Sequence, residues 1–201
     1  MLRLAVATFA VLVLASCAPS METVRQQHSQ VSSCCASLSE LGYVKLGASD
    51  DQAFELGKDS RAYAFETGRS YFRAFELPEG GPHEVTLSSY VVGDPPNWYV
   101  FCPVVLMLDS GFRPLRTIGT EVLRWETATV FETSGWRKKL VGNIQVGAGD
   151  ERYLVIHTTD PLLAQASNVE MQKFVVVVPY TDVVAVPNAP AGNLRVRLGS
   201  R

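Results

Sequence analysis

Residues that commonly carry catalysis are few in this chain, and they lie in no recognised catalytic spacing. The histidines are His28, His83 and His157, and the sequence holds neither a His-Glu-x-x-His helix, a Gly-x-Ser-x-Gly turn nor a glycine-rich phosphate loop. His157 falls within a predicted strand, where a packed imidazole is the ordinary role. The adjacent acids Asp150 and Glu151 diverge from a turn instead of facing each other across a cleft. The sequence therefore predicts a protein that is not an enzyme, with no metal and no other cofactor.

Three cysteines after the leader could form a covalent link. Cys34 and Cys35 are adjacent, and Cys102 lies far along the chain. Either Cys34 bonds to Cys35 in a tight ring, or one of them bonds to Cys102, or the adjacent pair is free and redox-active. Metal ligation would need further His or Cys in ligand spacing, and the sequence has none.

Aromatic residues near predicted loops and strand ends are the candidates for ligand recognition. An aromatic face packs against the C–H face of a sugar ring, while neighbouring polar groups bond its hydroxyls. The alternative is that each ring belongs to the core. A sugar site would need a groove with two or more exposed rings. The candidate carbohydrate-binding residues are Trp98, Tyr99, Trp125 and Trp136.

The N-terminus has the pattern of a leader that ends in a modified cysteine. Arg3 precedes an apolar run, Leu4–Leu14, that is too short to span a bilayer. Leu14-Ala15-Ser16-Cys17 resembles the lipobox of bacterial lipoproteins, whose Cys is acylated and becomes the first residue. This resemblance implies membrane attachment through acyl chains on Cys17. Ala18, where an Asp would retain a lipoprotein at the inner membrane, implies sorting to the outer membrane.

Composition and order predict one domain behind that leader. We expect a signal peptide at residues 1–16, a flexible polar tether at 17–31 and a single domain at 32–201. A net charge of −2 gives no reason to expect nucleic acid as a partner. No interior apolar run has membrane-spanning length.

The domain reads as many short strands separated by turn residues. Two short helices are expected, at 32–42 and 160–166. The pattern predicts a mainly β fold, an antiparallel β-sandwich of jelly-roll-like type. The predicted strands are 43–46, 52–56, 62–66, 70–77, 84–92, 98–102, 104–109, 140–146, 152–158, 174–178 and 194–198, with 115–125 ambiguous and 187–193 a loop.

The last predicted strand alternates regularly. Leu194, Val196 and Leu198 should point inward, and Arg195 and Arg197 outward. Exposed arginines favour a charged edge strand.

Four stretches of the chain can be compared with a known family, namely Cys34–Leu41, Gly68–Pro78, Phe101–Asp109 and Arg152–Thr159. Together they resemble the maltose-operon periplasmic proteins. The resemblance implies an envelope protein linked to maltose or maltodextrin uptake and supplies no catalytic residues. It makes Cys34–Cys35 the family-compatible bridge, because Cys102 stands where relatives have Ala.

Two functions remain open after this resemblance. The first is a non-catalytic lipoprotein that is an accessory or binding component of carbohydrate uptake, with maltodextrin as a possible ligand. The second is a structural lipoprotein that docks an envelope protein partner and binds no sugar. Both place the protein at the outer membrane, facing the periplasm.

Overall fold

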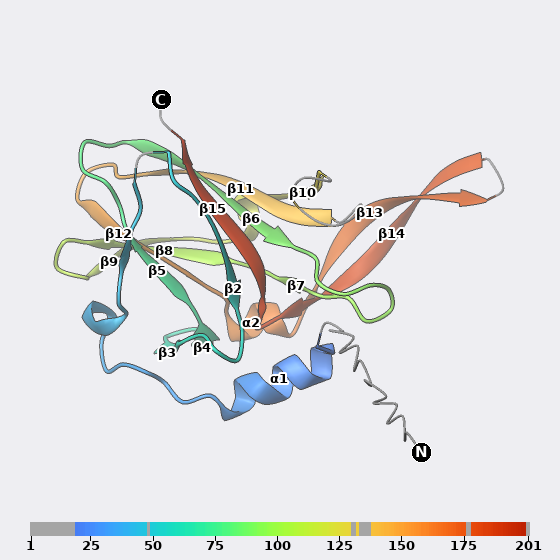
Figure 1. Cartoon of the computed structure of the whole chain (residues 1–201), viewed down its shortest axis with the longest axis horizontal. Helices are drawn as coiled ribbons and strands as arrows, with labels where there is room; N and C mark the ends of the chain where they lie inside the picture. The colour runs from blue at the N-terminus through green and yellow to red at the C-terminus, as the bar shows by residue number, and fades with distance from the viewer. Residues whose placement is uncertain (1–18, 48, 130–131, 133–137, 176–177, 200–201) are drawn as a thin grey trace, which may run out of the picture.

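Two five-stranded sheets form the body of the protein in a computed structural model (Figure 1). The structure describes residues 19–47, 49–129, 132, 138–175 and 178–199. The β12 sheet has the order β1 (Val44–Lys45), β5 (Arg73–Glu76), β12 (Glu151–His157), β8 (Val104–Asp109) and β9 (Pro114–Ile118). The β6 sheet has the order β10 (Leu123–Thr127), β11 (Lys138–Val146), β6 (His83–Tyr90), β15 (Gly192–Gly199) and β2 (Asp51–Leu56).

The two sheets enclose one main hydrophobic core. Strand alternation places Val85 and Leu87 of β6 on its inner side, and Leu154 and Ile156 of β12 meet them from the other sheet. Phe75 at the centre of this core is completely buried. The predicted mainly β, antiparallel sandwich is confirmed, and the strand pairings within it are antiparallel except β1 with β5.

Smaller elements complete the fold. β3 (Ala62–Phe65) and β4 (Gly68–Tyr71) form the predicted hairpin, with Phe65 opposite Gly68. β7 (Val100–Phe101) pairs in parallel with the end of β14 (Val178–Ala189). Short 3-10 turns lie at Leu38–Glu40 and Thr120–Val122. The expected helix at 32–42 is thus reduced to a single turn.

The segment predicted as a flexible tether contains a helix instead. α1 (Met21–Gln30) begins at Ser20, whose side chain accepts a hydrogen bond from the Thr23 N–H. Its one buried side chain, Val24, packs against Tyr99, Ala189 and Ala191. Partly buried Met21 packs against the same cluster. Two apolar contacts in ten residues leave too little periodicity to predict the helix from the sequence, yet they dock it.

Two further sequence predictions are corrected. β15 alternates as expected, but it lies between β6 and β2 and is not an edge strand. Its arginines lie on the outer face of a sheet, where Arg197 is exposed and Arg195 is partly buried. Residues 187–193 are not one loop, because β13 (Ala166–Val175) and β14 form a long hairpin that ends at Ala189 (Figure 1).

The second predicted helix is present as α2 (Asp160–Leu163), with Pro161 in its first turn and Thr159 as the capping residue. None of the helices in the described ranges is both long and apolar enough to cross a membrane.

Candidate functional site

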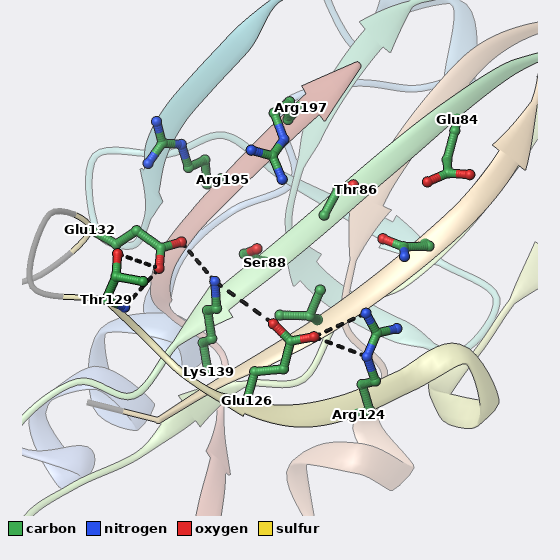
Figure 2. A pocket seen from close by; sticks show the side chains of 12 residues that line it. Glu84, Thr86, Ser88, Arg124, Glu126, Thr129, Glu132, Lys139, Arg195 and Arg197 are labelled. Atoms are coloured by element: carbon green, nitrogen blue, oxygen red, sulfur yellow. Dashed lines mark hydrogen bonds and ion pairs between the residues drawn. The ribbon is translucent and has the colours of Figure 1, made fainter. Parts of the chain in front are cut away.

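A polar pocket of about 550 Å³ lies on the outer face of the β6 sheet (Figure 2). Its walls come from four neighbouring strands and from the segment that follows β10. Almost all lining side chains are charged or carry a hydroxyl or amide. They are Glu84, Thr86, Ser88, Arg124, Glu126, Thr129, Glu132, Lys139, Val141, Asn143, Arg195 and Arg197.

The register of the sheet explains why these side chains meet. Ser88 lies opposite Val141 on one side and Arg195 on the other. Two residues earlier, Thr86 lies opposite Asn143 and Arg197. Since side chains alternate between faces, the residues between these positions fill the core, and this set faces outward together.

Glu132 and Lys139 form the best-ordered part of the polar pocket. Lys139 Nζ lies 2.7 Å from Glu132 Oε1, and the Tyr90 hydroxyl donates to the same oxygen at 3.1 Å. The Thr129 N–H and hydroxyl donate to Oε2 at 2.9 and 3.1 Å. Burial raises the pKa of Glu132, but the donated hydrogen bonds outweigh it and bring that pKa down to about 2. Glu132 is therefore a fixed negative charge at neutral pH.

The charges continue along the sheet. Lys139 Nζ is 4.0 Å from Glu126, whose other oxygen accepts from Arg124 Nε at 2.9 Å. Arg195 is held by Asp51 on β2, with Nη2 2.8 Å from Oδ2. Within the described part of the chain, no hydrogen bond or ion pair occupies the side chains of Arg197 and Asn143. Both are exposed and line the pocket.

This arrangement suits a ligand with many hydroxyl groups. Carboxylates fixed by partners act as acceptors, while Arg197 and Asn143 offer donors without losing an existing bond. The pocket volume lies within the range of about 300–1,000 Å³ usual for small-molecule sites. Over the described residues, no group of three His, Cys, Asp or Glu side chains is placed to hold a metal ion.

The aromatic candidates are not brought together here. Trp98 is 8 % exposed in a cluster with Val100 and Cys102, and half-buried Trp125 packs against the same cluster. Tyr99 is 2 % exposed and packs with Val24. Trp136 lies outside the described residues. The described rings among the candidates thus serve packing. For Trp125, strand alternation within β10 turns the ring to the side opposite Arg124 and Glu126.

The cysteines lie apart from the polar pocket. Cys102 is buried, and burial raises the pKa of its thiol to about 11 despite a hydrogen bond with Ser167. The sulfur atoms of Cys34 and Cys35 lie 2.05 Å apart, beside the guanidinium of Arg61. Their pairing stays a prediction for chemical mapping. Cys17 lies outside the described residues.

Sequence reasoning missed most of the polar pocket. The outward arginines of β15 were recognised, but as features of an edge. The available signal was the shared alternation of polar residues on segments 84–88, 139–143 and 195–197. Only the sheet order shows that these three segments are neighbours.

Comparison with known proteins identifies one family. A family model described as maltose operon periplasmic protein precursor (MalM) matches residues 67–177, more than half of the chain. The matched range includes β6, β10 and β11, which supply most of the polar pocket. No curated protein and no solved structure matches the chain significantly.

Proposed function

Since the chain belongs to the maltose operon periplasmic protein family, we propose that it is a non-catalytic lipoprotein that binds maltodextrin for an uptake system. The family itself is periplasmic and associated with the maltose operon. The proposal adds three points to the family assignment, namely a lipid anchor at Cys17, a location at the outer membrane and a sugar ligand.

The polar pocket is the observation that supports sugar binding. Sugars present closely spaced hydroxyls that both donate and accept, so a surface of fixed acceptors beside unused donors complements them. Glu126 and Glu132 are held by Lys139 and Arg124, while Arg197 faces the same hollow without an ion pair among the described residues (Figure 2). Recognition would depend on hydrogen bonds, because no aromatic ring is among the described residues that line this pocket.

Calorimetric titration with maltotetraose tests the proposal. The full-length protein in detergent should release or absorb heat on binding, and Arg197→Ala should weaken the affinity by about tenfold, or about 1.4 kcal/mol. Arg113→Ala is the control, since Arg113 is an exposed arginine in the turn between β8 and β9, at the edge of the other sheet and away from the polar pocket. Absence of heat with millimolar sugar would remove the sugar-binding claim.

A structural role in docking an envelope partner is the second candidate. β13 is the end strand of its sheet, and Val183 of the hairpin is 62 % exposed. This role predicts a silent sugar titration together with cross-linking in intact cells from a photoreactive residue at position 183. The same group at exposed Ser39 should give no product.

A further inference from the structure

A second, smaller pocket lies on the opposite face of the sandwich. It occupies about 230 Å³ on the outer side of the β12 sheet, between the β3–β4 hairpin and the edge strand β9. We refer to it as the ring pocket. Tyr63 and Phe65 of the hairpin line it together with Leu106, Thr117 and His157 of the sheet. Its volume is below that of a drug-sized site and suits a single ring.

His157 supplies an unused acceptor to the ring pocket. The imidazole is 4 % exposed, and Nδ1 lies 2.9 Å from the Thr158 carbonyl oxygen. Because a carbonyl only accepts, Nδ1 must carry the proton, and Nε2 of the neutral ring then presents a lone pair. Within the described residues no hydrogen bond reaches Nε2. Burial keeps the ring neutral by lowering the pKa of His157 to about 4, against the opposing hydrogen bond with Thr158.

Aromatic rings fix the shape of this pocket. Phe65 stacks on His157 with centroids 4.0 Å apart and planes 12° apart. Tyr63 meets Phe65 edge to face at 4.9 Å. The face of an aromatic ring attracts the C–H groups of a saturated ring, while Thr117 and Glu66 place polar groups at the walls.

The hairpin that carries these rings is anchored at its turn. The Asp160 N–H donates to the Thr67 carbonyl at 3.0 Å, which ties the turn to the start of α2. Gly68 has φ +120°, and a Cβ there would collide with the Asp160 carboxylate. The pocket wall is therefore built before any ligand arrives.

From this geometry we propose that the ring pocket binds one pyranose ring, with a sugar hydroxyl donating to His157 Nε2. An apolar ring of the same size would cover the Nε2 acceptor without bonding it, whereas a sugar hydroxyl can donate a hydrogen bond to it. The site is separate from the polar pocket, since the two lie on the outer faces of different sheets. The ring-pocket proposal is therefore independent of maltodextrin binding at the polar pocket.

Nuclear magnetic resonance with D-glucose as the probe tests this site. On addition of glucose to about 50 mM, above the millimolar dissociation constant expected of a small polar ligand, the ¹⁵N resonance of His157 Nε2 should move. The ring protons of Tyr63 and Phe65 should move with it. This measurement on the unaltered protein requires no substitution and is the first readout.

Variants separate the two pockets. His157→Phe keeps an aromatic ring but removes the acceptor, so it should abolish the glucose-induced shifts of Tyr63 and Phe65. Arg197→Ala, in the polar pocket, should leave them unchanged. Unmoved Nε2 and ring resonances at that glucose concentration would overturn the proposal, as would shifts in His157→Phe equal to those of the unaltered protein.

Discussion

Two titratable residues, His157 and Glu132, show how packing fixes opposite charge states within one fold. Both pKa values are lowered by local contacts. His157 is enclosed by Phe65 and the β12 sheet, whereas Glu132 accepts hydrogen bonds from Lys139, Tyr90 and Thr129. The continuously apolar residues before His157 predict a strand histidine, and His157 does end β12. The role of Glu132 could not be predicted in this way, because its hydrogen-bond donors come from β6, β11 and the segment after β10.

Stability should fall on mild acidification because of His157. Its pKa of about 4 lies below the unfolded value of 6.5, so the unfolded chain binds the proton more tightly. The contribution is complete above pH 6.5 and is lost as pH falls toward 4, by about 3 kcal/mol in all. Urea denaturation at several pH values measures this slope.

His28 titrates in the same direction, because burial also lowers its pKa. His157→Gln should therefore remove most of the slope between pH 6.5 and 4.5, and His28→Gln a smaller part. A slope unchanged in His157→Gln would show that this imidazole is not buried as described.

The Glu132 carboxylate should stabilise the fold at neutral pH. Glu132→Gln removes a charged partner from Lys139, whose side chain is only 11 % exposed, and should cost about 1–2 kcal/mol in the free energy of unfolding. The contribution is present above the unfolded pKa of 4.5 and is lost as pH falls toward 2. Glu126→Gln is the matched control, since Glu126 is more exposed and 4.0 Å from Lys139 Nζ. Denaturation at pH 7 in low salt compares the two, and equal costs would refute the special position of Glu132.

The adjacent cysteines can be mapped directly. Mass spectrometry of peptides prepared without reduction should find Cys34 linked to Cys35 and Cys102 as a free thiol, because Cys102 is buried away from both. Alkylation of the unfolded, unreduced protein gives the number of free thiols. Three alkylated thiols, or a Cys102 bridge, would contradict the pairing.

At the scale of elements, the alternation of apolar and polar residues predicted where strands occur, but not which strands pair with each other. The pattern of Val85, Leu87 and Ser89 marked one face of β6 correctly, and the buried run 104–109 is β8 as expected. The outward-facing Arg195 and Arg197 suggested an edge, because a central strand with one solvated face has the same alternation as an edge strand. The distinction depends on which strands pair, and these are distant in sequence.

The docking of α1 against the domain can be tested by measuring its contribution to stability. Val24 is 2 % exposed, and Arg25 and Arg69 add hydrogen bonds to carbonyls of Leu163 and Ser29 at 3.2 and 3.0 Å. Val24→Ala should cost about 1–2 kcal/mol and should speed amide hydrogen exchange in residues 21–30. Gln26→Ala, at an exposed position of the same helix, should change neither. Fast amide exchange throughout residues 21–30 in the unaltered protein would support the predicted flexible tether and contradict the docked helix.

At the scale of the whole molecule, a docked α1 shortens the reach of the domain. Only Ala18 and Pro19 lie between Cys17 and the capping Ser20, and the three Cα-to-Cα steps allow about 10 Å of extended chain. A lipid on Cys17 would therefore hold the sandwich against the membrane surface instead of on a long tether. The polar pocket and the ring pocket lie on opposite outer faces of the sandwich, so they would differ in their orientation toward the membrane surface.

Cys17→Ser tests the anchor itself. Two acyl chains give stable attachment, at about 0.8 kcal/mol per buried methylene, while none of the described helices is able to span the bilayer. The variant should therefore move from the membrane fraction to the soluble periplasmic fraction, as measured by fractionation and immunoblotting. Cys102→Ser, which alters a buried cysteine of the domain, should stay with the membrane, and Ala18→Asp should shift the protein to the inner membrane. If Cys17→Ser still sediments with membranes, the fold holds the protein there by its own contacts, and the lipid at Cys17 is not its anchor.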